Sequence, residues 1–265
     1  MITSLQNQRI KDVVKLTNAR ERRRQNLFVI EGARELSLAI AGGYPVKSLF
    51  VCDELLNGAG LGLIDKLDIV TEKVSVDVFR KIAYREESDG IIAVSESRNL
   101  SFDTVQLSQN PFIIVLEAVE KPGNLGAILR TADAARVDAV IVCDPKTDLY
   151  NPNTVRSSIG CVFTQQVIAC ASNDALQWLK KKGISIFAAE LAASELYYET
   201  DFTQPAAIVM GTEADGLTGF WLRNADRRIK IPMRGCIDSL NVSVSTAVIT
   251  FEAMRQRGIN HLRTD

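Results

Sequence analysis

Three short apolar runs most constrain how this chain can fold: Phe112–Leu116, Ala139–Cys143 and Ala206–Met210. Each run is bordered on both sides by proline, glycine or an acidic residue. An apolar run this short is typical of a strand that is covered on both faces, as in a parallel sheet. Segments with helical patterns follow or separate the runs, so we predict an open parallel α/β sheet in residues 111–265. We expect its helices near 121–136, 174–182 and 242–257 and further strands at 184–188 and 228–231.

The N-terminal part also alternates strands with helices, on a smaller scale. Its pattern predicts helices at 9–16, 33–41 and 76–83 and strands at 27–30, 48–52, 68–71 and 90–94. We therefore expect a small α/β domain in residues 1–100. The polar stretch that follows it predicts a linker at residues 101–110.

Composition narrows the class of protein. The chain has 265 residues, of which 46% are apolar and 24% charged, which is typical of a globular protein and excludes a disordered chain. It has neither the pattern of a secretion signal nor an apolar stretch long enough for a transmembrane helix, so we expect a cytoplasmic protein. Five scattered cysteines indicate free, mostly buried thiols. The single histidine, His261, argues against histidine-based catalysis, and we expect no metal site.

A basic run near the N-terminus is the first candidate functional feature. It contains Arg20, Arg22, Arg23 and Arg24, and residues 1–34 hold eight basic and three acidic side chains. Such a run is typical either of a solvated helix face or of a phosphate-binding patch. The net charge of the whole chain, −1, does not decide between the two.

Three polar loops follow predicted strands, and ligands of open parallel sheets bind at the carboxyl ends of strands. The first loop begins at Lys121 and leads through Asn124 into a helix that carries Arg130. The second, Gly211–Gly216, contains Glu213. The third, Ile231–Asn241, contains Ser239. Any of Ser239, Asn241 and Ser243 could simply cap the last helix.

Together the three loops resemble the signature motifs of the SpoU/TrmH-type RNA 2′-O-ribose methyltransferases of the SPOUT superfamily. The matching patterns are Asn-x-Gly-x-x-x-Arg, Met-Gly-x-Glu-x-x-Gly-Leu and Ile-Pro-Met-x-Gly-x-x-x-Ser-Leu-Asn-Val-Ser-Val, in that order. The resemblance covers about residues 112–257. The N-terminal part looks like the ribosomal-protein-like RNA-binding domain of many members. One departure, Thr246 at a position where many members carry small or apolar residues, is expected to be harmless.

The resemblance implies a C-terminal trefoil-knotted domain, a homodimer and S-adenosyl-L-methionine as methyl donor, with no metal. It assigns binding of the methyl donor to Gly211, Ile231 and Leu240. It implies that a ribose 2′-OH of RNA is methylated and that Arg130 takes part in activating this hydroxyl. Because guanidinium stays protonated in proteins, we interpret Arg130 as a stabiliser of oxyanion charge.

The remaining loop side chains complete the expected site. Glu213 would accept the proton or fix Arg130, and Ser239 would hydrogen-bond Asn124 or the substrate. Asn124 and Asn241 would hold the RNA or the loops. These features favour a ribosomal RNA methyltransferase over three alternatives. Transfer to a tRNA ribose and a non-catalytic RNA-binding protein stay open, whereas a nucleotide-binding dehydrogenase fails because no strand leads into Gly-x-Gly-x-x-Gly.

Overall fold

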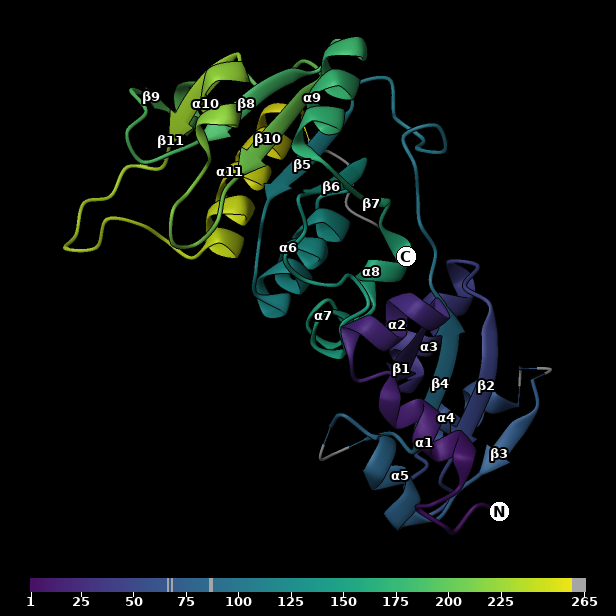
Figure 1. Cartoon of the computed structure of the whole chain (residues 1–265). Helices are drawn as coiled ribbons and strands as arrows, with labels where there is room; N and C mark the ends of the chain where they lie inside the picture. The colour runs from purple at the N-terminus through teal and green to yellow at the C-terminus, as the bar shows by residue number, and fades with distance from the viewer. Residues whose placement is uncertain (66, 68, 86–87, 259–265) are drawn as a thin grey trace. The chain divides into compact units, whose positions relative to one another are not determined.

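The computed structural model describes residues 1–258 apart from 66, 68, 86 and 87, and His261 lies outside this part of the chain. The chain forms two compact units (Figure 1). Unit 1 comprises residues 1–98 and 148–164, and unit 2 comprises residues 99–147 and the chain from 165 onward. The backbone therefore passes from one unit to the other at three points, after residues 98, 147 and 164.

Unit 2 is built on a seven-stranded sheet in the order β7-β6-β5-β10-β8-β11-β9, and every neighbouring pair is parallel. The fold class predicted for this part is confirmed. The strands are β5 (Phe112–Glu117), β6 (Ala139–Cys143), β7 (Val167–Cys170), β8 (Ser185–Ala189), β9 (Glu195–Leu196), β10 (Ala206–Met210) and β11 (Arg227–Lys230). The trefoil knot stays a prediction.

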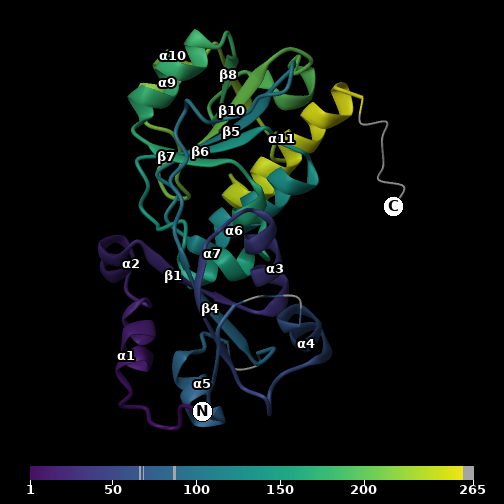
Figure 2. The ribbon, with the colours of Figure 1, turned by 90° about the vertical axis from the view of Figure 1, so that its right-hand side faces the viewer.

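Helices cover both faces of this sheet, which explains the uninterrupted apolar runs (Figure 2). One face packs against α9 (Ser172–Lys181) and α10 (Gly219–Asn224), and the other against α6 (Pro122–Ala134) and α11 (Val242–Gln256). Along β5, Ile113 and Val115 belong to the core under α9, and Ile114 between them faces the opposite way. A short 3₁₀ helix, Tyr197–Glu199, follows β9.

The predicted linker is part of unit 2. Leu100, Phe102, Val105 and Leu107 pack against the core under α9, and the Phe102 ring stacks on Trp178 with centroids 4.9 Å apart. These apolar side chains fix the segment against the core of unit 2, so it is not a free tether between domains.

Unit 1 contains a four-stranded sheet in the order β1-β4-β2-β3, with β4 antiparallel to both of its neighbours. Its strands are β1 (Leu27–Glu31), β2 (Val46–Val51), β3 (Thr71–Lys73) and β4 (Ile91–Glu96). Its helices are α1 (Gln8–Lys15), α2 (Ala19–Gln25), α3 (Ala33–Ala41), α4 (Gly58–Ile64), α5 (Val76–Ile82), α7 (Pro152–Ser157) and α8 (Cys161–Thr164). Helices α1 and α5 cover one face of the sheet through Ile10, Val13 and Phe79.

Residues 148–164 lie in unit 1, whereas the sequence assigned them to the C-terminal domain at 111–265. Aromatic packing explains the difference. Phe28 of β1 stacks on Tyr150 and Phe163, with centroids 4.4 and 5.8 Å apart, and Tyr44 packs edge-on against both rings. The sequence separation of these partners exceeds one hundred residues, so no local pattern could reveal the packing.

The last helix presents a different face from the one we expected. The sequence places Val244, Ala247, Val248, Phe251 and Met254 on one apolar stripe. In the structure Ile249 and Ala253 are fully buried, whereas Val244 and Phe251 are about half exposed. Thr246 is buried and its hydroxyl donates to the Val242 carbonyl at 2.7 Å, so its polar group is satisfied.

The strand expected at 68–71 begins only at Thr71. Cys52, Cys143 and Cys161 are buried, as predicted, and none of the five cysteines, all of which lie in the described residues, forms a disulfide. Within the described residues, no helix combines the length and apolar character needed to cross a membrane.

Candidate active site

The three motif loops leave the sheet at the carboxyl ends of β5, β10 and β11. Because all strands of unit 2 are parallel, these ends share one edge. Asn124 lies in the first turn of α6, Glu213 lies in the loop after β10, and Asn241 is the N-cap of α11. The sheet topology therefore brings residues that are up to 117 positions apart to one place.

Side-chain hydrogen bonds join the three loops directly. The Asn124 amide donates a short hydrogen bond to Glu213 Oε1, and Asn241 Nδ2 donates to Asn124 Oδ1 at 3.2 Å. The side-chain oxygen of Asn241, Oδ1, caps α11: it accepts hydrogen bonds from the Ser243 backbone N–H at 2.9 Å and from the Ser243 hydroxyl at 2.6 Å. Both sides of each amide are thus used, and the three loops form one connected group.

The loop after β10 is a closed turn. Thr212 and Gly216 exchange two backbone hydrogen bonds of 3.0 and 3.2 Å, and Gly216 adopts a φ of +68°. A Cβ atom on Gly211 would collide with the backbone of Gly216 and Leu217, so only glycine fits there. The turn places Glu213 at its tip, where Asn124 reaches it.

Glu117 supports this turn, and the sequence analysis did not single it out. This buried carboxylate ends β5 and accepts hydrogen bonds from the backbone N–H and the hydroxyl of Thr218, at 2.8 and 2.7 Å. Thr218 is the N-cap of α10, directly after the turn. The signal available in the sequence was an acidic residue that directly follows an apolar run.

The third loop offers free backbone groups. Pro232–Leu240 is mostly exposed, and no backbone N–H within it donates to another backbone group of the described chain. Ser239 donates to Asp238 at 3.1 Å, so the expected contact with Asn124 is not formed. Backbone donors need partners, so this loop is suited to a ligand that is bound through main-chain groups.

Arg130 is exposed on α6, six residues after Asn124. Within the described residues its side chain has no hydrogen-bond or ion-pair partner. Glu213 bonds Asn124 instead, so the expected pairing of Glu213 with Arg130 is not formed. The guanidinium is therefore free for a ligand.

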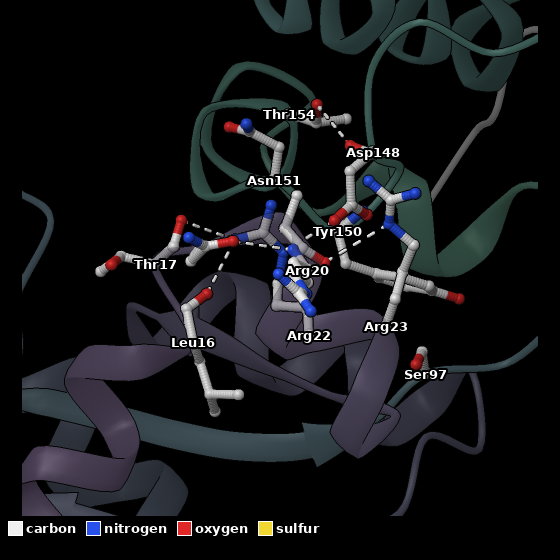
Figure 3. A network of polar contacts seen from close by, with 12 residues as sticks. Leu16, Thr17, Arg20, Arg22, Arg23, Ser97, Asp148, Tyr150, Asn151 and Thr154 are labelled. Carbon is white, nitrogen blue, oxygen red and sulfur yellow. Dashed lines mark hydrogen bonds and ion pairs between the residues drawn. The ribbon is translucent and has the colours of Figure 1, made fainter.

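The N-terminal arginine run divides into exposed and buried members. Figure 3 shows three of them, Arg20, Arg22 and Arg23, beside their polar neighbours. Arg20, Arg23 and Arg24 are on α2 and reach solvent, with Arg24 paired to Glu21 at 2.7 Å. Arg22 is only 3% exposed. Its guanidinium donates to Asp148 at 2.8 Å and to the carbonyls of Leu16 and Thr17 at 2.7 and 2.9 Å. Of the arginines that the sequence offers as a phosphate-binding patch, Arg22 therefore has its donors used inside unit 1.

A parallel sheet covered on both faces, with three hydrogen-bonded loops at its carboxyl edge, defines an α/β protein with a ligand site at the strand ends. The sequence profile of the SpoU rRNA Methylase family matches residues 111–251, and that of the MRM3-like substrate binding domain matches residues 7–93. The chain belongs to the SpoU rRNA Methylase family.

Individual relatives match almost the whole chain. A Bacillus subtilis protein named 23S rRNA (guanosine(2553)-2′-O)-methyltransferase RlmP is 30% identical over 94% of this chain and 97% of its own length. A crystal structure of an RNA 2′-O ribose methyltransferase is 38% identical, with a TM-score of 0.87 over 97% of this chain and 98% of the other. The SpoU methyltransferase AviRb from Streptomyces viridochromogenes, solved with AdoMet, is 27% identical, with a TM-score of 0.89 over 95% of this chain and 98% of the other.

Proposed function

We propose that this protein transfers a methyl group from S-adenosyl-L-methionine to a ribose 2′-OH of ribosomal RNA. The observation that carries the proposal is the hydrogen-bonded chain Glu213–Asn124–Asn241, which joins all three motif loops at one edge of the sheet. Relatives named as 23S rRNA 2′-O-methyltransferases and a structural neighbour solved with AdoMet support the reaction and the substrate.

The loops suit a methyl donor that is bound through the main chain. Gly211 and Ile231 directly follow β10 and β11, and Leu240 directly precedes the cap of α11. The backbone N–H groups of residues 233–240, which have no backbone partner within the described chain, supply hydrogen-bond donors for such a ligand. When bound, S-adenosyl-L-methionine supplies a methyl group attached to a positively charged sulfur.

Two side chains are suited to act on the ribose hydroxyl. Arg130 stays protonated, so it orients the substrate and stabilises negative charge that develops on the 2′-oxygen. Glu213 Oε2 has no hydrogen-bond partner within the described chain, so it is free to accept the hydroxyl proton. Asn124 and Asn241 hold the loops in register, and Ser239 is left exposed for the substrate.

The proposal is tested by titrating the protein with S-adenosyl-L-methionine in a calorimeter and by measuring methyl transfer from a labelled donor to RNA. Ribosomal RNA from cells that lack the gene is expected to accept one methyl group on a ribose, detected as an alkali-resistant dinucleotide. Labelling of tRNA instead would favour a tRNA 2′-O-methyltransferase. RNA binding without affinity for the methyl donor would identify a non-catalytic RNA-binding protein and contradict the proposal.

We further propose that unit 1 binds the RNA, with Arg20, Arg23 and Arg24 on phosphates. Replacing all three with glutamine is expected to weaken RNA binding and to flatten its dependence on salt concentration. For every phosphate that is no longer neutralised, the slope of log K against log salt should fall by about 0.7 to 0.9. Affinity for the methyl donor should not change.

The matched control replaces Lys180, Lys181 and Lys182, three exposed lysines at the end of α9 in unit 2, with glutamine. It removes the same charge elsewhere on the chain, so it should leave the slope nearly unchanged. Equal slopes for the two triple variants would contradict the phosphate contacts and would favour the other interpretation of the α2 arginines, a solvated helix face.

The remaining assignments concern assembly and location. We infer a homodimer in which a second copy covers the exposed apolar side chains of α11, Val244 and Phe251. An rRNA-modifying activity also fits the cytoplasmic location expected from the sequence.

A further inference from the structure

Unit 1 contains a cavity of about 60 Å³ between α1, β1, the end of α5 and α7. Its walls are mainly aliphatic and are formed by Val13, Leu16, Val29, Ile82, Ala83 and Val155. Helix α7 belongs to the segment 148–164, so the cavity exists because this segment covers the sheet of unit 1. The α2 arginines do not line it.

Three basic side chains are among the described residues that line the cavity. Lys81 of α5, Arg85 and Arg156 of α7 line it, and Glu31 is the only acidic residue that does so within the described chain. Lys81 and Arg156 are exposed and have no ion-pair partner among the described residues, whereas Arg85 is paired with Glu35. Two cations are therefore available for a negatively charged ligand.

A tyrosine completes the rim and is held in place through its backbone. The buried Glu31 carboxylate accepts hydrogen bonds from the backbone N–H groups of Tyr84 and Arg85, at 2.7 and 3.2 Å. Burial raises the pKa of Glu31, while these two hydrogen bonds act in the opposite direction. The Tyr84 side chain is 51% exposed, so its ring is open to a stacking partner.

Aliphatic walls, an exposed aromatic ring and two free cations match the chemistry of an unpaired nucleotide, which has a flat ring and an adjoining phosphate. The cavity is too small to enclose a nucleoside, so it suits the edge of a base. We propose that unit 1 binds one unpaired RNA nucleotide here, with the base edge in the cavity beside Tyr84 and its phosphate on Lys81 and Arg156. This inference rests on the proposed function, because it takes RNA as the partner.

The first test measures binding of a fluorescein-labelled oligouridylate, about ten nucleotides long, to the full-length protein. Lys81→Gln combined with Arg156→Gln is expected to weaken binding about tenfold. The control combines Arg80→Gln on α5 with Arg34→Gln on α3, which removes the same charge from exposed residues of unit 1 outside the cavity lining. This control should change the affinity less than twofold.

A second variant, Ala83→Leu, fills the cavity without changing any charge, and should also weaken binding about tenfold. An oligouridylate that carries one 4-thiouridine should cross-link to the peptide containing Tyr84, and Ala83→Leu should abolish that cross-link. Equal losses in the two charge variants, unchanged affinity in Ala83→Leu, no binding by the unmodified protein or cross-links confined to other peptides would each overturn the inference.

Methyl transfer separates failure of this inference from failure of the proposed function. If Ala83→Leu and the double variant methylate rRNA with an unchanged KM, the nucleotide subsite is wrong and the proposed activity stands. If the unmodified protein neither binds S-adenosyl-L-methionine nor methylates RNA, the proposed function itself is wrong. A KM for rRNA raised about tenfold at unchanged kcat would support both.

Discussion

Arg130→Ala is expected to lower kcat for RNA methylation by about 100-fold or more, with little change in affinity for S-adenosyl-L-methionine. The guanidinium is exposed and has no partner within the described chain, so its charge is available to the reacting 2′-oxygen. Arg130→Lys should recover part of the rate, because an ammonium keeps the charge but loses the planar set of donors. Single-turnover methylation of rRNA measures both effects.

The control for this prediction is Arg223→Ala, which removes a helical arginine from α10 of the same unit. The free energy of unfolding of both alanine variants should lie within about 0.5 kcal/mol of that of the unmodified protein, because surface substitutions usually change stability this little. Turnover by Arg130→Ala at the unmodified rate would remove Arg130 from the mechanism and leave Glu213 as the side chain to test next.

Arg22→Ala is expected to destabilise unit 1 by about 3 kcal/mol. The substitution removes an ion pair in which the side chains of Arg22 and Asp148 are 4% and 15% exposed. It leaves Asp148 Oδ2 and two backbone carbonyls without the guanidinium that donates to them. Both tryptophans lie in unit 2, so their fluorescence does not report unit 1 directly. Hydrogen exchange of peptides covering residues 16–26 and 148–154 should show the loss of protection.

A double-mutant cycle separates the ion pair from the other contacts of Arg22. Asp148→Asn keeps an acceptor for the Tyr150 backbone N–H, and Arg22→Met keeps much of the buried side-chain volume. The loss of unfolding free energy in the double variant should be smaller than the sum of the losses in the two single variants, by at least about 0.5 kcal/mol. Arg23→Ala, an exposed neighbour, serves as the control, and a destabilisation as large as that of Arg22→Ala would contradict a specific role for the buried pair.

The sequence predicted the parts of the fold in which local pattern and burial agree. The runs Ala139–Cys143 and Ala206–Met210 coincide with β6 and β10. A strand that is buried on both faces is apolar at every position, so the first polar, proline or glycine residue marks its end. The motif loops could be located for the same reason, since each follows a strand of this sheet. Their hydrogen-bonded chain needed the structure, because it depends on which strands are neighbours.

The arginine run shows why other parts could not be predicted. Arg20, Arg22 and Arg23 are the same residue type in one short run, and of these three only Arg22 is buried. It is buried where it pairs with Asp148, and no local pattern reveals a partner that lies 126 positions away in the sequence. The apolar stripe of α11 misled us for a related reason. A hydrophobic pattern predicts that a helix face is buried but does not say what covers it. Within the described chain, Val244 and Phe251 of this stripe remain about half exposed.

The three backbone crossings have a consequence for how such proteins can be divided or recombined. A gene fragment ending near residue 98 would encode the sheet of unit 1 without Tyr150 and Phe163, and would expose the Phe28 ring that they cover. The complementary fragment would carry those two aromatic side chains with nothing to bury them. Exchange of unit 1 between relatives therefore requires two separate pieces of the gene to be transferred together.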